Sequence, residues 1–238
     1  MSAPNHVHPT AVIGDAVRMG TGNVIGPNVV ITGDVVLGDD NWIGPNTCIG
    51  IEGDLFGIPS VATADWWTDG RTAATHGVRL GSRNVLKEGV TIHAGSHRHT
   101  ELGDDAYLMP RSHLGHDCWL GDNVTLSPNA QIAGHVAIGT RAVIGMGALV
   151  HQFSAIGPVV MVGMGAVVRE LVAPARTVVG DPLQVSGINK VGLSRLLGSE
   201  ADRDTLRALR AEDTWDQLPS VLRDAISRWR EHIAQRGH

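Results

Sequence analysis

One stretch of the chain repeats an aliphatic residue at every sixth position. Residues 102–163 read LGDDAYLMPRSHLGHDCWLGDNVTLSPNAQIAGHVAIGTRAVIGMGALVHQFSAIGPVVMVG. The aliphatic residues, spaced without a slip, are Leu102, Leu108, Leu114, Leu120, Leu126, Ile132, Ile138, Ile144, Val150, Ile156 and Val162. A six-residue period fits neither the 3.6-residue turn of an α-helix nor the two-residue alternation of an ordinary strand. Each hexad is therefore expected to form one short strand followed by a corner.

The same period extends toward the N-terminus. It runs from Val7 to Ile49 and again from Leu80 to Ile92, which makes 22 hexads, and Gly follows the aliphatic residue in 14 of them. Glycine suits a tight corner because it has no Cβ. Three sides of this kind close a triangular coil whose aliphatic residues point inward and stack on those of the next coil. The sequence predicts an all-β fold, a parallel β-helix of about seven coils.

The composition agrees with a narrow, repetitive core. Aromatic residues make up only 4% of the 238 residues, whereas 30 are Gly. The net charge of −5 and the pI of about 6.1 argue against nucleic acid and against a membrane surface as partners. Neither a signal-peptide pattern nor an apolar run of the roughly 18 residues that span a bilayer is seen. The only cysteines, Cys48 and Cys118, are expected to be reduced thiols in a cytoplasmic protein.

Two interruptions and a change of pattern divide the chain. We expect a β-helix over residues 1–182, with insertion loops at 50–78, which contains Trp66 and Trp67, and at 97–101. Long ordered loops on a rigid scaffold are often functional, although the first loop is equally suited to packing against a neighbouring subunit. From about Asn189 the apolar spacing becomes helical, and Ser199 is a suitable helix cap. Residues 183–238 are therefore expected to form a C-terminal helical domain that caps the prism.

The coil length indicates which residues lie close together. In an unbroken run, residues 18 positions apart occupy adjacent coils, at about the 4.8 Å separation of paired strands. At this spacing His116 is followed by Gly134 and then by Gln152. The polar residues that gather on this side of three consecutive coils are His113, His116, Asp117, His135, His151 and Gln152.

This cluster has the chemistry of a proton-transfer site. A single histidine is more often a surface or hydrogen-bonded structural residue, but four on neighbouring coils favour a reactive site. Histidine takes and returns a proton near neutral pH. An adjacent carboxylate such as Asp117 fixes its tautomer and stabilises its protonated form. Gly134 leaves a backbone N–H uncovered for a developing oxyanion.

Five motifs on these coils resemble those of a known family. They are VTIHAG (90–95), SHLGHDC (112–118), IAGHVAIG (132–139), VHQFSAIG (150–157) and VMVG (160–163). They are similar to the successive motifs of the UDP-N-acetylglucosamine 3-O-acyltransferases of lipid A synthesis. The resemblance implies a left-handed β-helix and a homotrimer with its clefts between subunits. It also implies acyl transfer from an acyl-carrier-protein thioester, with no bound cofactor.

The resemblance assigns roles to individual residues. His116 would be the general base, Asp117 would orient it, and the N–H of Gly134 would bind the oxyanion. Met164 matches a position that acts as a hydrocarbon ruler, which implies a short or medium acyl group; alternatively, Met164 only fills a gap. The other residues that match substrate-binding positions are Asp54, His113, His135, His151, Gln152, Asn189 and Arg195.

Some residues depart from the family pattern. Phe56 stands where the family has a lysine that grips the acceptor sugar, and Val191 and Leu196 replace an acidic and a basic residue. We therefore expect a sugar-like or nucleoside acceptor, acylated on a hydroxyl or an amine. The alternatives are a CoA-dependent hexapeptide acetyltransferase, a zinc enzyme of the γ-carbonic-anhydrase type, and a noncatalytic scaffold.

Overall fold

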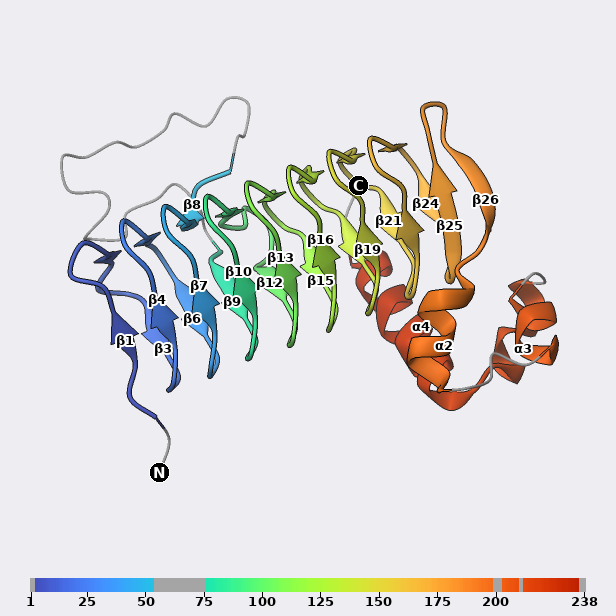
Figure 1. Ribbon diagram of the computed structural model, residues 1–238, viewed down its shortest axis with the longest axis horizontal. Helices are drawn as coiled ribbons and strands as arrows, with labels where there is room; N and C mark the ends of the chain where they lie inside the picture. Colours follow the sequence, from blue (N-terminus) through green and yellow to red (C-terminus); the bar gives the residue numbers. More distant parts are fainter. Residues whose placement is uncertain (1–2, 54–75, 199–202, 210–211, 236–238) are drawn as a thin grey trace.

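The computed structural model describes residues 3–53, 76–198, 203–209 and 212–235. It confirms the predicted left-handed parallel β-helix, in which short strands form three sheets that run side by side along one long axis (Figure 1). Sheet A contains β1 (His6–Val7), β4 (Val24–Ile25), β7 (Trp42–Ile43), β10 (Val85–Leu86), β13 (Tyr107–Leu108), β16 (Thr125–Leu126), β19 (Val143–Ile144), β22 (Met161–Val162), β25 (Arg176–Val179) and β26 (Gln184–Ile188).

The other two sheets have eight strands each. Sheet B contains β2 (Val12–Ile13), β5 (Val30–Ile31), β8 (Cys48–Ile51), β11 (Thr91–His93), β14 (His113–Leu114), β17 (Gln131–Ile132), β20 (Leu149–Val150) and β23 (Val167–Val168). Sheet C contains β3 (Arg18–Met19), β6 (Val35–Leu37), β9 (Val78–Leu80), β12 (Thr100–Leu102), β15 (Trp119–Leu120), β18 (Ala137–Ile138), β21 (Ala155–Ile156) and β24 (Leu171–Val172).

The strand register confirms the predicted coil length. Leu114 pairs with Ile132, and Ile132 pairs with Val150, so each step of 18 residues advances the chain by one coil. These aliphatic side chains are buried and stack along the inside of the prism. The glycine that follows many of them is required by close approach to the next coil, because a Cβ on Gly115 would lie 2.8 Å from the carbonyl carbon of Ala133.

The two insertions are shorter than the sequence predicted. Gly50 and Ile51 belong to β8, where Ile51 pairs with His93 of β11 and Gly50 lies at a shift of the register. Val78 begins β9, where it pairs with Val35 of β6. Thr100 and Glu101 belong to β12, where they pair with Val78 and Arg79, so the predicted loop at 97–101 ends at His99. Asp54, Phe56, Trp66 and Trp67 lie outside the described residues.

The predicted C-terminal helical region, residues 183–238, opens with a strand, β26, and its first helix begins directly after Asn189, as the apolar spacing predicted. β26 pairs antiparallel with β25 and so satisfies the backbone groups of a strand that would otherwise be the exposed edge of sheet A. The helices that follow are α2 (Lys190–Leu197), α3 (Arg203–Ala208), the 3-10 helix η1 (Glu212–Gln217) and α4 (Ser220–Ala234). Among the residues with described positions, no helix is long and apolar enough to cross a bilayer.

The helices contact two parts of the prism. One apolar cluster joins Val159 and Ala175 of the last coils to Leu193 of α2 and Leu222 of α4. A second cluster packs Trp229 of α4 against Trp119, which lies on a face of sheet C. His232 of α4 stacks on the Trp119 indole, with 3.9 Å between the ring centroids. The helical region therefore closes one end of the prism and also covers part of sheet C (Figure 1).

Candidate functional site

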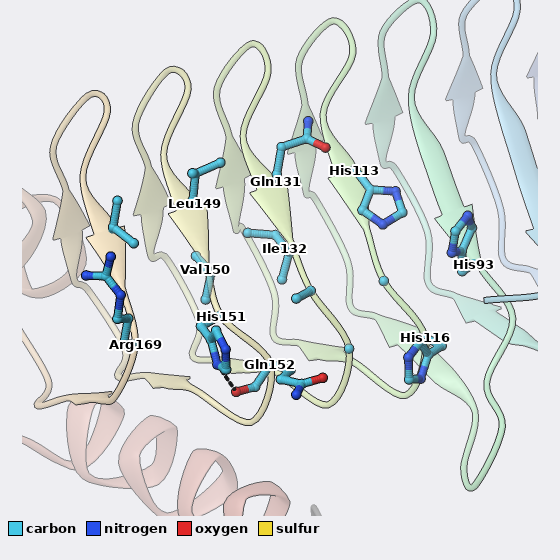
Figure 2. Close-up of a pocket in the computed structure, with 14 residues that line it drawn as sticks. His93, His113, His116, Gln131, Ile132, Leu149, Val150, His151, Gln152 and Arg169 are labelled. Carbon is cyan, nitrogen blue, oxygen red and sulfur yellow. Dashed lines mark hydrogen bonds between the residues drawn. The ribbon is translucent and has the colours of Figure 1, made fainter. Parts of the chain in front are cut away.

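A cavity of about 530 Å³ lies along sheet B. It follows the strands and corners of successive coils from β11 to β23, as the ladder of side chains in Figure 2 shows. The residues that line it are His93, His113, Gly115, His116, Gln131, Ile132, Ala133, Gly134, Leu149, Val150, His151, Gln152, Val167 and Arg169. Four histidines at the polar positions and aliphatic side chains between them give the cavity both reactive and apolar surface.

His116 and Asp117 form a hydrogen-bonded pair at the corner after β14. His116 Nδ1 lies 2.6 Å from Asp117 Oδ2. Because an ionised carboxylate only accepts hydrogen bonds, this contact places the imidazole proton on Nδ1 and leaves the lone pair on Nε2. The His116 side chain is 13% exposed and lines the cavity, whereas the Asp117 side chain is fully buried behind it.

The chain holds the Asp117 carboxylate in its charged form. Oδ1 accepts the backbone N–H groups of Ser96, His97 and Arg98 at 2.7–2.9 Å, and Oδ2 accepts the Ser96 hydroxyl at 2.6 Å. Burial alone would raise the pKa of Asp117, but the hydrogen bonds from His116, from Ser96 and from the backbone outweigh it and hold the pKa well below its ordinary value. Asp117 is therefore a permanent acceptor for the His116 proton.

Two glycines make room for the His116 ring. A Cβ on Gly134 would lie 2.5 Å from His116 Nε2, and a Cβ on Gly53 would lie 2.8 Å from His116 Cδ2. The imidazole therefore rests directly against the backbone of the next coil, as the 18-residue spacing predicted. Across the described part of the chain, the Gly134 N–H donates to no acceptor, so it is available to a ligand in the cavity.

His135 also lies next to Asp117, with its ring edge-on to that of His116 at 5.0 Å between centroids, but it does not line the cavity. Its Nε2 is 3.6 Å from Asp117 Oδ2, and its ring stacks on Phe153 with centroids 4.5 Å apart. Burial lowers the pKa of His135 below its ordinary value, against the opposing effect of the Asp117 charge. The ligand atoms of His97, Asp117 and His135 lie within 4.8 Å of one another, which is close enough to share a metal ion.

The predicted residues His113, His151 and Gln152 do line the cavity, and sequence reasoning missed others. His93 packs edge-on against His113 at 4.6 Å between centroids, and Arg169 lies at the far end, where it pairs with Asp181 at 2.6 Å. Four extra residues between β11 and β12 shift the register, so Thr91 pairs with His113, which follows it by 22 residues and not by 18. A count of the extra loop residues would have placed His93 in the cavity.

Other predicted residues lie elsewhere in this chain. Asn189 and Arg195 line a second cavity of about 670 Å³ over sheet A. The Asn189 side chain caps α2 by accepting the Gly192 N–H at 2.9 Å and donates to the Val159 carbonyl at 2.8 Å. Met164 is 76% exposed and lines neither cavity. Asp54 falls outside the part of the chain that the structure describes.

The sequence profile described as bacterial transferase hexapeptide (six repeats) matches residues 99–134 and 117–152. Over 42 residues the chain is 48% identical to an acyl-(acyl-carrier-protein)–UDP-N-acetylglucosamine O-acyltransferase of Paraburkholderia phymatum. That stretch spans 16% of this chain and 16% of the relative. The clearest sequence similarity therefore covers only a small part of either protein.

The fold is shared over nearly the whole chain. The UDP-N-acetylglucosamine acyltransferase of Francisella novicida superposes with a TM-score of 0.73 at 22% identity, over 96% of this chain and 90% of that one. The acyltransferase of the same description from Campylobacter jejuni gives a TM-score of 0.71 at 24% identity, over 98% of this chain and 91% of that one. These likenesses confirm, at the level of the fold, the resemblance that the motifs indicate.

Proposed function

We propose that this chain is an acyltransferase that moves a short or medium acyl group from a carrier thioester to a hydroxyl or an amine of a nucleotide-sugar or related acceptor. The observation that carries the proposal is the arrangement of His116 between Asp117 and Gly134. The imidazole donates to a buried carboxylate on one side, and on the other its Nε2 lies against Gly134, whose backbone N–H donates to no acceptor among the described residues. This combination supplies a base and an oxyanion donor at one end of an open cavity.

In the first step, His116 Nε2 removes the proton from the acceptor hydroxyl or amine while the acceptor atom attacks the thioester carbonyl carbon. The Nδ1–H of the resulting imidazolium faces the Asp117 carboxylate at 2.6 Å, which stabilises the positive charge as it forms. A fully buried and ionised partner does this without reorganisation of solvent.

In the second step, the tetrahedral intermediate breaks down. Its oxyanion accepts a hydrogen bond from the Gly134 N–H, the carbon–sulfur bond breaks, and His116 returns its proton to the departing thiolate. A single oxyanion donor is worth about 10²–10³ in rate. The aliphatic residues Ile132, Leu149 and Val150 give the rest of the cavity an apolar wall suited to an acyl chain.

The substrates are proposed from the relatives. The Paraburkholderia protein is described by name as acting between an acyl carrier protein and UDP-N-acetylglucosamine, and its aligned stretch is nearly half identical to this chain. We propose the same donor class here, with an acyl carrier protein or CoA carrying the thioester on phosphopantetheine. The acceptor remains a nucleotide-sugar or related compound, because Phe56 replaces a basic family residue.

We further propose a homotrimer with the site at the subunit boundary. In one chain the cavity of His116 lies on sheet B, whereas Asn189 and Arg195 line the cavity over sheet A. Leu149, which lines the first of these, and Met164 both expose apolar surface. Packing sheet A of one copy near sheet B of another would bring both cavities together and cover these side chains.

The test is a mass measurement of products. The purified protein is incubated with a panel of acyl carrier proteins and acyl-CoAs and a panel of nucleotide-sugars and nucleosides. We expect an acceptor that gains the mass of one acyl group, and competition between the two donors identifies the preferred carrier. A protein that transfers no acyl group to any member of the panel would refute the proposal and favour the noncatalytic scaffold.

A further inference from the structure

The three side chains of His97, Asp117 and His135 have the spacing of a small metal site. His135 Nε2 and His97 Nδ1 lie 3.6 Å and 3.9 Å from Asp117 Oδ2. Both distances are too long for hydrogen bonds. Ligand atoms at about 2.0–2.1 Å from a tetrahedral zinc ion are roughly 3.3 Å apart, so small movements of the side chains would close the site.

The surroundings of each of these three side chains suit it to coordinate a metal ion. Asp117 is fixed by the backbone N–H groups of residues 96–98, which all donate to Oδ1. Oδ2 accepts the Ser96 hydroxyl and the His116 Nδ1–H, and it is also the carboxylate oxygen that faces His97 and His135. The His135 ring is held in place by its stack on Phe153 and makes no hydrogen bond to the residues described. The His97 side chain is 77% exposed, so it is free to close over an ion once it gives up its contact with Ser96 Oγ.

We propose that His97, Asp117 and His135 form an inhibitory zinc-binding site next to the catalytic base. Two imidazoles and one carboxylate suit Zn²⁺, and three protein ligands leave a fourth coordination position for water. Magnesium prefers an octahedron of oxygen ligands, which this set does not supply. The site is distinct from the cavity, because neither His97 nor His135 lines it.

Inhibition follows from the shared carboxylate oxygen, and this part of the inference rests on the proposed function. Asp117 Oδ2 is the atom that accepts the His116 Nδ1 proton at 2.6 Å. A zinc ion on Oδ2 withdraws electron density from it and places positive charge beside His116 Nδ1. The imidazole then loses the partner that stabilises its protonated form, so acyl transfer slows until a chelator removes the ion.

Metal binding is measured first, without substrates. The full-length protein is dialysed against Zn²⁺, and against Co²⁺ as a spectroscopic probe whose visible absorption reports tetrahedral coordination. We expect one tight ion per chain with a tetrahedral cobalt spectrum, and no binding of Mg²⁺ at the same concentration. His97→Ala and His97→Gln should each lose at least about tenfold in affinity, at least as much as loss of an outer-shell partner costs.

The choice of variants separates this site from adventitious binding. His97→Ala keeps the backbone N–H that binds Asp117, and His97→Gln also keeps most of the side-chain volume. The control is His6→Ala, which removes an exposed histidine in β1 at the far end of the prism and should bind zinc as the wild type does. In the acyl-transfer assay, zinc should inhibit the wild type and the control reversibly, and the His97 variants should keep basal activity but resist zinc.

Two results would overturn the proposal. One is the absence of a tight zinc ion on the wild-type protein. The other is an unchanged zinc affinity or cobalt spectrum in both His97 variants. Because the binding measurements need no substrate, they give an answer even if the protein transfers no acyl group, so the two proposals fail separately.

Discussion

Consecutive residues His116 and Asp117 are hydrogen-bonded to each other at 2.6 Å across a corner of the prism. Neighbouring side chains in a strand point to opposite faces, so this contact depends on the corner. Asp117 has a φ of 59°, in the left-handed region that short polar side chains tolerate, and its backbone N–H donates to Thr100 Oγ1 at 2.9 Å. The corner thus turns the carboxylate back beneath the imidazole.

Replacing the carboxylate should reduce the rate more than the stability. Asp117→Asn keeps an oxygen for the three backbone N–H groups but removes the charge that stabilises imidazolium and fixes its tautomer. We expect kcat to fall by about 10²-fold or more, in the range of general-base effects. Steady-state kinetics of acyl transfer measure this. Asp15→Asn, at an exposed corner, is the matched control, and an equal loss in both variants would contradict the assigned role.

The glycine beside the base should not tolerate a methyl group. In Gly134→Ala the new Cβ would lie 2.5 Å from His116 Nε2, so the imidazole must move away from the oxyanion donor. We expect activity to fall by about 10²-fold, comparable with the loss of an oxyanion donor. Gly14→Ala is the control, since its Cβ would meet Thr32 at an ordinary 3.4 Å. Wild-type activity in Gly134→Ala would show that the close contact is unimportant.

Met164 should set the length of the acyl group. If the trimer covers its exposed side chain and places it at the end of an acyl pocket, Met164→Gly opens that end, because packed interiors do not absorb a large side chain without cost. We expect the preferred acyl chain to lengthen, as measured by product masses from carriers with different acyl groups. The matched control is Met146→Gly, which makes the same change one coil earlier. An unchanged chain-length profile in Met164→Gly would rule out the ruler.

A buried asparagine ladder should contribute to stability. Asn41 Oδ1 accepts the Asn84 N–H at 2.9 Å, and Asn41 Nδ2 donates to Asn23 Oδ1 and to the Gly81 carbonyl. Asn41→Ala leaves buried polar groups unpaired, which costs about 1–3 kcal/mol for each group. Denaturant unfolding should show this loss. Asn5→Ala, at the exposed end of the ladder, should cost less because water replaces the lost partner. Equal losses would contradict the explanation.

The sequence predicted the prism and part of the site for one physical reason. A rigid 18-residue coil converts sequence spacing into distance, so His116 and Gly134 were placed together correctly. His93 and the N–H groups that hold Asp117 were missed, because the inserted loop breaks that spacing. The corner geometry was also missed. At the three corners of the site the left-handed residues are Asp117, His135 and Phe153, three positions after the aliphatic residue, and not the residue that directly follows it.

The roles of Asn189, Arg195 and Met164 depend on how chains pack against one another. The first two line a cavity over sheet A, and Met164 is exposed, so one chain does not join them to His116. The repeat indicates how coils stack within a chain but carries no information on how chains pack. These roles therefore stay predictions, and they depend on the proposed trimer.

The most direct measurement is the turnover number of His116→Ala with the acyl donor and acceptor that the product screen identifies. Removal of the imidazole eliminates the base, while the apolar stack at Leu114 and Ile132 that builds the coil is left intact. We predict a folded protein whose kcat is lower by about 10²–10⁴-fold, the contribution of a positioned base. A folded His116→Ala protein that transfers the acyl group at the wild-type rate would contradict the role of His116 as the catalytic base.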